Sequence, residues 1–171
     1  MLDQHTIFNS FSINVYRHRS LLHQLIVSIL YLASFSLFAD DLPVKFEHLT
    51  VADGLSENGV YTIVEDRQGF MWFGTRLGLN RYDGKEFKVF SYNPMDKNSL
   101  PGYKISALCV DQEGVLWVGT SSGGMSKYIS SQERFENFQH DPEDPNSLPG
   151  NNVTALFSDS RGSLWVGTEQ G

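Results

Sequence analysis

The chain has 171 residues and a formal net charge of −7, so it is long enough for one ordinary domain and is not expected to bind nucleic acid. Its one cysteine, Cys109, excludes an intramolecular disulfide and a cysteine-based zinc site. Fifteen glycines and 13% aromatic residues, with no long helix-forming run after the N-terminal segment, favour an all-β domain rich in turns.

The N-terminal segment, residues 1–39, has the layout of an export signal. Arg17 and Arg19 precede an apolar run, residues 21–39, which contains no Asp, Glu, Lys or Arg and is followed by two aspartates. This order predicts a signal peptide, and the run is also nearly long enough for an uncleaved signal anchor. A buried core helix is the remaining alternative. Either export interpretation places residues 40–171 outside the cytoplasm, in the periplasm.

A ten-residue pattern organises the rest of the chain and occurs at residues 66–75, 111–120 and 159–168. Each copy reads Asp-x-x-Gly-x-x-Trp-x-Gly-Thr, and the tryptophans of successive copies lie 45 and 48 residues apart. A period of this length with a glycine and tryptophan signature is typical of β-propellers. The residues to which we assign the structural repeat motif are Asp66, Gly69, Trp72, Gly74, Asp111, Gly114, Trp117, Gly119, Asp159, Gly162, Trp165 and Gly167.

Around each motif the sequence predicts short strands. A first strand precedes the aspartate, the Asp-x-x-Gly turn follows with its glycine at a positive φ, and the tryptophan strand returns to complete a β-hairpin. Third and fourth strands follow in the first two copies, and four strands in about 45 residues make one propeller blade. The Phe-x-x-Phe spacing of the fourth strands predicts a bend or bulge there. The predicted strands are residues 60–64, 105–110 and 153–157 (first), 79–82 and 125–128 (third), and 87–90 and 135–138 (fourth).

Residues 45–49 resemble residues 134–138 and therefore predict an orphan outer strand. The expected fold is an all-β, incomplete β-propeller after an N-terminal hydrophobic helix. Two full four-stranded blades, a half blade and the orphan strand fill residues 40–171, with repeats at about 55–92, 100–139 and 148–171. We expect no helix between residues 55 and 171. A ring needs at least about four blades, so we expect the chain to be the N-terminal part of a longer protein whose remaining blades are its partners.

The repeat resembles the two-component regulator propeller family. The third copy carries the resemblance best, in a string from Leu148 through Asn151 and Asp159 to Trp165 and Thr168. The resemblance covers residues 44–171. It implies the periplasmic sensor region of a bacterial signalling receptor, tethered to the inner membrane by one transmembrane helix and expected to be a homodimer. It also implies a cytoplasmic histidine kinase or diguanylate cyclase output, which this sequence does not contain, and a carbohydrate as a candidate ligand.

The residues that could carry chemistry are scattered, so we assign no catalytic, cofactor-binding or metal-binding residue and no enzymatic activity to this chain. The aspartate turns lack the neighbouring carboxylates of a calcium loop. His48 and His140 are interpreted as solvated, and Cys109 as a buried, inert thiol. The tryptophans are interpreted as packing between blades rather than as a sugar-stacking array. The acids that could form a glycosidase or lyase pair share no spacing and are interpreted as solvated: Glu113, Glu133, Glu136, Glu143 and Asp144.

Three functions stay open at this point. The first is a periplasmic sensor module without catalysis, in which a ligand biases a dimer across the membrane. The second is a secreted propeller enzyme that acts on polysaccharides, and the third is a non-catalytic scaffold or adhesion propeller. In each case the binding residues are expected on loops at one face of the ring.

Overall fold

The structure is a computed structural model that describes residues 44–171, of which residues 47–171 form one compact unit. The predicted export signal and hydrophobic helix, residues 1–39, lie outside the described residues. Among the helices of residues 44–171, none has the length and apolar character needed to cross a membrane.

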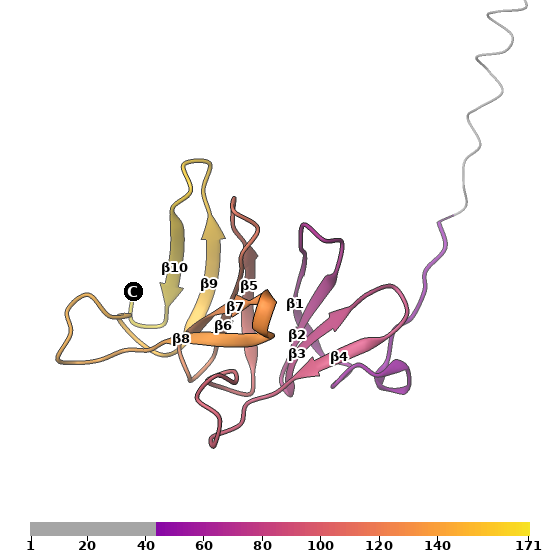
Figure 1. Ribbon diagram of the computed structural model, residues 1–171, viewed down its shortest axis with the longest axis horizontal. Coiled ribbons are helices and arrows are strands. Elements are labelled where there is room, and N and C mark those ends of the chain that lie inside the picture. The colour runs from indigo at the N-terminus through magenta and orange to yellow at the C-terminus, as the bar shows by residue number, and fades with distance from the viewer. Residues whose placement is uncertain (1–43) are drawn as a thin grey trace, which may run out of the picture. The chain divides into compact units, whose positions relative to one another are not determined.

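Ten short strands in the described residues form three antiparallel sheets, and within each sheet the strands pair in sequence order (Figure 1). The first sheet contains β1 (Val60–Glu65), β2 (Met71–Thr75), β3 (Gly78–Tyr82) and β4 (Phe87–Phe90). The second contains β5 (Ile105–Val110), β6 (Leu116–Thr120), β7 (Met125–Ile129) and β8 (Arg134–Phe138). The third contains β9 (Val153–Ser158) and β10 (Leu164–Thr168). The all-β prediction of two full blades and a half blade is confirmed.

Two single turns of 3-10 helix interrupt this pattern in residues 44–171, η1 (Val51–Asp53) and η2 (Ser130–Gln132). The second lies between β7 and β8, so the prediction of no helix after residue 55 is wrong by this one turn. The helical turn forms because the connection between β7 and β8 reverses the chain direction, which it does through Glu133 at a positive φ of 48°. A residue in the left-handed region ends a helical turn and reverses the chain direction.

The orphan outer strand predicted at residues 45–49 is absent. Residues 44–50 have no regular secondary structure, and Phe46 is 80% exposed. A strand needs a partner edge to satisfy its backbone groups, and in the described residues each third strand already pairs with its own fourth strand. The segment instead leads into η1, where Thr50 and Asp53 form a capping box.

The Phe-x-x-Phe strands also differ from their prediction. Phe87–Phe90 and its counterpart β8 pair with their neighbours without a register shift. Residues three apart in a strand point to opposite faces, and here both faces are apolar: Phe87 contacts Tyr82, and Phe90 contacts Trp72, with ring centroids 4.7 and 5.7 Å apart. The fourth strand therefore needs no bulge to bury both rings.

The bulges lie instead in the first strand of every sheet. The register shifts by one residue at Tyr61 in β1, at Ser106 in β5 and at Thr154 in β9. A bulge increases the local twist of the strand that carries it. Its recurrence at the same place in all three described sheets makes it part of the repeat.

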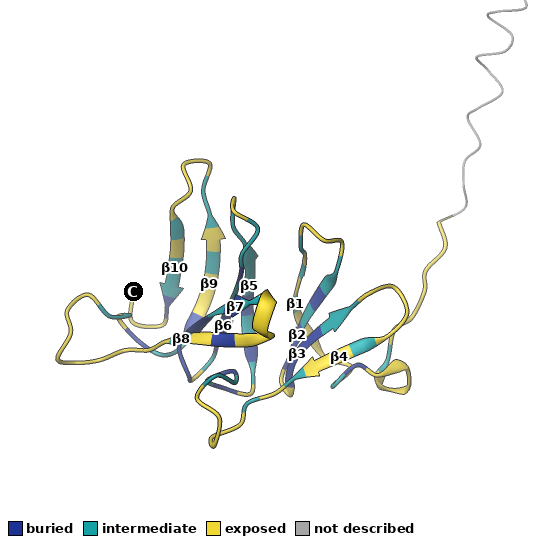
Figure 2. Cartoon of the chain, in the orientation of Figure 1, coloured by how far each residue is buried: buried dark blue, intermediate teal, exposed yellow. Residues whose placement is uncertain are grey.

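The hydrophobic core lies between the first and second sheets (Figure 2). The face of the first sheet that contains Trp72 and Leu79 packs against the face of the second that contains Ile105 and Val118, and these four side chains are almost fully buried. The other face of the second sheet is covered by β9, which packs on β5 and β6. Remaining members of the cluster are Leu100, Leu116, Tyr128 and Phe135.

Candidate functional site

The aspartate that opens each repeat motif holds the hairpin turn with one carboxylate oxygen. Asp66 Oδ1 accepts hydrogen bonds of 3.0 Å from the backbone N–H groups of Gln68 and Phe70. The Gly69 N–H donates to the Asp66 carbonyl at 3.0 Å, and this glycine has a φ of 86°. Asp111 and Asp159 make the same contacts in their own turns. Such a turn needs a short acceptor side chain at its start and a glycine in the left-handed region.

The second oxygen of each of these aspartates accepts a hydrogen bond from the tryptophan six residues later. The indole N–H of Trp72 donates to Asp66 Oδ2 at 2.7 Å, and the equivalent bonds of Trp117 and Trp165 are 2.7 and 2.9 Å. The carboxylate therefore fixes both the turn and the indole ring. The constant Asp–Trp spacing in the sequence was the signal for this bond, which sequence reasoning missed.

These bonds shift the acid–base properties of two of the aspartates. Partial burial acts to raise the pKa of Asp111, but the hydrogen bonds from the Trp117 indole and from backbone N–H groups outweigh it and lower this pKa from its ordinary value of 3.8. The Trp165 indole and the Ser163 N–H lower the pKa of Asp159 in the same way. Both groups are therefore carboxylates at neutral pH.

The glycine two residues after each tryptophan lies where a neighbouring sheet approaches. A Cβ on Gly74 would stand 2.7 Å from Ile105 Cγ2 of the second sheet, and one on Gly119 would stand 2.6 Å from Val153 Cγ1 of the third. Carbon atoms pack no closer than about 3.5 Å, so a side chain is excluded at both glycines. Gly167, in the third sheet, meets only atoms of its own sheet among the described residues.

The three tryptophans hold equivalent register positions but differ in burial. Trp72 is 1% exposed because Tyr128 of the second sheet covers it, with ring centroids 5.0 Å apart. Trp117 is half-buried and contacts Phe138 of its own sheet at 5.9 Å. Trp165 is 64% exposed. The motif fixes the place of each indole, and the next sheet decides how far it is buried.

A group of charged residues at the outer rim joins the first two sheets. Arg81 lies over the Phe70 ring at 4.7 Å and donates to Tyr128 Oη at 3.4 Å and to Glu133 at 3.3 Å. Lys88 also binds Glu133. The hydrogen bond from Lys88 lowers the pKa of Glu133, whereas burial raises the pKa of Tyr128. We call Arg81, Lys88, Tyr128 and Glu133 the rim clamp.

The other residues considered for chemistry are not brought together. His48 and His140 are exposed, and His140 Nδ1 lies 2.7 Å from the Leu148 carbonyl. Cys109 is half-buried, and burial raises the pKa of its thiol. The five acids that sequence reasoning considered are all exposed. Within residues 44–171, no three His, Cys, Asp or Glu side chains gather in a way that could hold a metal ion.

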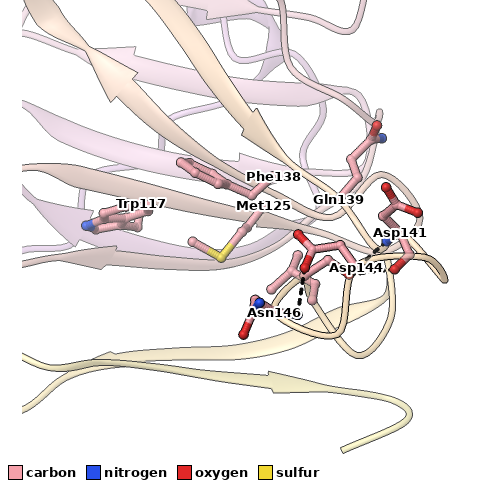
Figure 3. A pocket seen from close by; sticks show the side chains of 9 residues that line it. Trp117, Met125, Phe138, Gln139, Asp141, Asp144 and Asn146 are labelled. Carbon is pink, nitrogen blue, oxygen red and sulfur yellow. Dashed lines mark hydrogen bonds between the residues drawn. The ribbon is translucent and has the colours of Figure 1, made fainter.

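Two cavities lie at the loops that connect one sheet to the next. The larger, about 450 Å³, lies between the aromatic and methionine side chains of the second sheet and the loop of residues 141–148 (Figure 3). The smaller, about 380 Å³, is lined by the loop of residues 92–101 together with Asn137 and Gln139. Two amides, the Ser147 hydroxyl and two loop aspartates supply the polar lining of the larger cavity, a chemistry suited to hydrogen bonding.

Comparison with protein families identifies the repeat. Residues 54–76, 99–122 and 147–170 match the model of the family described as Two component regulator propeller. Each match contains one Asp–Trp motif and the first two strands of one sheet. The part of this structure that matches the family model is thus the first hairpin of each sheet, together with the turn before it.

Individual proteins and solved structures are also similar to this chain. The chain is 42% identical to Histidine kinase P4 of Formosa agariphila over 67 residues, which are 39% of this chain and 5% of that protein. Among solved structures, the extracellular domain assigned to the hybrid two component system BT3049 of B. thetaiotaomicron is 34% identical, with a TM-score of 0.66 over 70% of this chain and 17% of that one. The extracellular domain of BT4673 from the same organism is 22% identical, with a TM-score of 0.42 over 72% of this chain and 22% of that one. This chain thus spans less than a fifth of the first two proteins.

Proposed function

We propose that this chain, which carries three two-component regulator propeller repeats, is part of the extracytoplasmic sensor propeller of a bacterial two-component receptor. The observation that carries the proposal is the in-register recurrence of the Asp–Trp motif in three sheets, combined with 34% identity to the extracellular domain of a two-component system. Fold alone does not set function, since propellers serve many roles. The repeat family and its relatives narrow the role to signal reception.

The periplasm is the compartment that this function requires. The basic residues before the apolar run of residues 21–39, and the aspartates after it, support export of residues 40–171. A β-lactamase fused after Gly171 is expected to confer ampicillin resistance on a Gram-negative host, because the enzyme protects cells only from the periplasm. Deletion of residues 21–39 should abolish that resistance while leaving the fusion expressed. Resistance that survives the deletion would contradict periplasmic placement.

In this proposal the chain contributes binding and no catalysis. Its aspartate turns are engaged in backbone and indole hydrogen bonds, and its larger cavity offers two amides, the Ser147 hydroxyl, two carboxylates and aromatic rings. A carbohydrate is the ligand class that this lining suits, through hydrogen bonds to its hydroxyls and stacking on aromatic rings. A histidine kinase output on the same polypeptide is supported by the match to Histidine kinase P4, with a diguanylate cyclase as the alternative, and a homodimer of the receptor would carry the signal.

The decisive experiment is made in the bacterium that encodes the chain. An in-frame deletion of residues 44–171 is expected to abolish the transcriptional response to one polysaccharide of a growth panel while the receptor's abundance at the membrane stays unchanged. The same strain complemented with the intact gene should regain the response. An unchanged response in the deletion strain would rule out a sensory role for these residues.

A further inference from the structure

The segment that leads from η1 into β1 contains Asn58-Gly59, the one Asn-Gly pair of the sequence. Both residues are exposed, and neither belongs to η1 or to β1. Because glycine has no Cβ, its backbone nitrogen meets little steric resistance when it approaches the side-chain amide carbon of the residue before it. The pair is therefore a place where the chain can react with itself.

The exposure of this position does not depend on what lies beside the first sheet. Asn58 lies two residues before β1, and its equivalent in the second sheet, Tyr103, lies two residues before β5. Tyr103 is 58% exposed although β1 packs against β5. A neighbouring sheet therefore leaves this position open to water.

The Asn58 side chain is held by its oxygen. The backbone N–H of Val51 donates to Asn58 Oδ1 at 2.9 Å. Within residues 44–171, neither the Asn58 Nδ2 group nor the Gly59 N–H donates to a protein acceptor. A donor on a carbonyl oxygen stabilises the negative charge that forms there when a nucleophile adds to the carbon. The amide carbon is thus polarised, while the attacking nitrogen and the leaving group are free of protein partners.

We propose that Asn58 undergoes spontaneous deamidation in the folded chain, with the Val51 N–H as the donor that polarises its amide. The Gly59 nitrogen loses its proton to solvent and bonds to Asn58 Cγ. The bond from Cγ to Nδ2 then breaks, and the Nδ2 group takes up a proton and leaves as ammonia. Water opens the resulting cyclic imide at either carbonyl and releases a proton, so that the residue at position 58 becomes an aspartate or an isoaspartate.

The reaction consumes only water and needs no oxidant, metal or enzyme. It is favoured by proximity, because the nucleophile and the electrophile belong to adjacent residues. The proposal does not rest on the sensory role proposed above.

A second asparagine has the same restraint but lacks the glycine. Asn151 holds the position of Asn58 in the third sheet, and its Oδ1 accepts from the His140 N–H at 2.7 Å. The next residue, Asn152, has a side chain that hinders the approach of its nitrogen. Asn151 is therefore a control within the same molecule.

Two aspartates are also followed by glycine, but hydrogen bonds keep them ionised. The Thr50 N–H lowers the pKa of Asp53, and the N–H groups of Glu86 and Lys85 lower the pKa of Asp83. A carboxylate resists addition of a nucleophile because its negative charge repels the incoming electron pair. These two pairs should therefore react more slowly than Asn58, and they release no ammonia.

Deamidation changes the segment that enters the first sheet. The product has one more negative charge, and its isoaspartyl form routes the main chain through the former side chain, which displaces the acceptor of the Val51 N–H. Val51 begins η1, whose capping box is formed by Thr50 and Asp53. We expect η1 to loosen, so that the Val51 amide exchanges hydrogen for deuterium faster in the modified chain.

The test incubates the full chain, folded, in mildly alkaline buffer and follows deamidation and isoaspartate at each asparagine by peptide mass spectrometry. We expect isoaspartate at position 58 to form about ten-fold faster than at position 151, or more. Gly59→Ala should slow the reaction at position 58 by about ten-fold or more without changing the circular dichroism spectrum. Alanine fits there, because its Cβ would meet only Glu57 Cδ, at 3.9 Å, and the backbone has no positive φ.

A further variant, Val51→Pro, removes the polarising donor. Proline suits the first position of η1, and the residue before it, Thr50, is already extended with a φ of −131° and a ψ of 178°. The reaction at position 58 should slow by about three-fold or more in the folded variant, as the loss of one hydrogen bond predicts. In urea, where that bond is absent, the variant and the parent chain should react at the same rate.

Four outcomes would overturn the proposal. They are a folded chain without isoaspartate at position 58, equal rates at positions 58 and 151, a Gly59→Ala variant that reacts as fast as the parent, and a folded Val51→Pro variant that reacts faster. The last outcome would mean that the hydrogen bond from Val51 restrains the asparagine instead of activating it.

Discussion

The interface between the first two sheets and the interface between the second and third are built from the same repeat, yet they differ in how much they bury. In the first, four strands face four strands, and Trp72 is 1% exposed. In the second, four strands face two within the described residues, and Trp117, the equivalent of Trp72, is only half-buried. The difference teaches that a motif residue acquires its stabilising role from the neighbouring sheet rather than from its own strand.

The largest effect is expected from the tryptophans. Trp72→Ala should lower the free energy of unfolding by about 3–5 kcal/mol, because it removes a large buried ring and leaves a cavity. Trp165→Ala, at the 64% exposed equivalent, should cost about 1 kcal/mol, chiefly the lost indole hydrogen bond to Asp159. Urea unfolding followed by circular dichroism measures both. If both variants lost the same free energy of unfolding, the stated difference between the two interfaces would be wrong.

The glycines provide the next test. Gly74→Ala should destabilise the chain by about 1–3 kcal/mol, because the new methyl group overlaps Ile105 of the facing sheet. The matched change Gly167→Ala, whose Cβ finds its nearest neighbour at 3.4 Å in its own sheet, should stay within about 0.5 kcal/mol. Urea midpoints of the two variants give the comparison directly. A larger loss from Gly167→Ala would mean that a further surface already lies against the third sheet.

The rim clamp should produce a smaller and salt-dependent effect. Glu133→Gln removes the anion shared by Arg81 and Lys88, so the urea midpoint should fall at low ionic strength. The difference should fade near 1 M salt, where the screening length is about 3 Å. Glu136→Gln, at an exposed position of β8, is the control and should leave the midpoint unchanged. A salt-independent loss in Glu133→Gln would point to the lost hydrogen bonds from Arg81 and Lys88 rather than to the charge.

The smallest effect is expected from acid. Because the folded-state pKa values of Asp111 and Asp159 lie below their ordinary 3.8, the stability they contribute is present above about pH 4 and is lost as the pH falls through the folded-state values. The urea midpoint should therefore decline below pH 4. Asp111→Asn should lower the midpoint at pH 7 and flatten part of this decline. If Asp111→Asn left the decline of the urea midpoint below pH 4 unchanged, other carboxylates would be responsible for that decline.

Much of the fold could be predicted from spacing alone. The three copies of Asp-x-x-Gly-x-x-Trp-x-Gly-Thr predicted the hairpins at the places where β1–β2, β5–β6 and β9–β10 lie, because turn chemistry is local. The orphan strand at residues 45–49 was wrong, because a strand depends on a distant partner edge that its own sequence does not reveal. The bulge was misplaced for a related reason: Phe87 and Phe90 serve two apolar faces, which only the packing shows.

The candidate site was less accessible to sequence reasoning. The acids share no spacing, so the sequence assigned no catalytic group; in the structure Glu133 belongs to the rim clamp and Asp144 lines the larger cavity. The rim clamp could not have been found, because Arg81 and Glu133 are 52 residues apart and meet only when two sheets stack. The larger cavity, beside Trp117, was equally hidden, since it is lined by a sheet and by the loop that leads to the next sheet.

The amino-acid sequence by itself determined the unit: an aspartate turn, a glycine with a positive φ and a tryptophan six residues after the aspartate, each fixed by backbone geometry within a few residues. Only the tertiary structure decided which copy of each residue is buried and which glycine must lack a side chain. The reason is that the stacking energy comes from contact with the face of the next sheet. The residues of a strand do not themselves show which face will cover them.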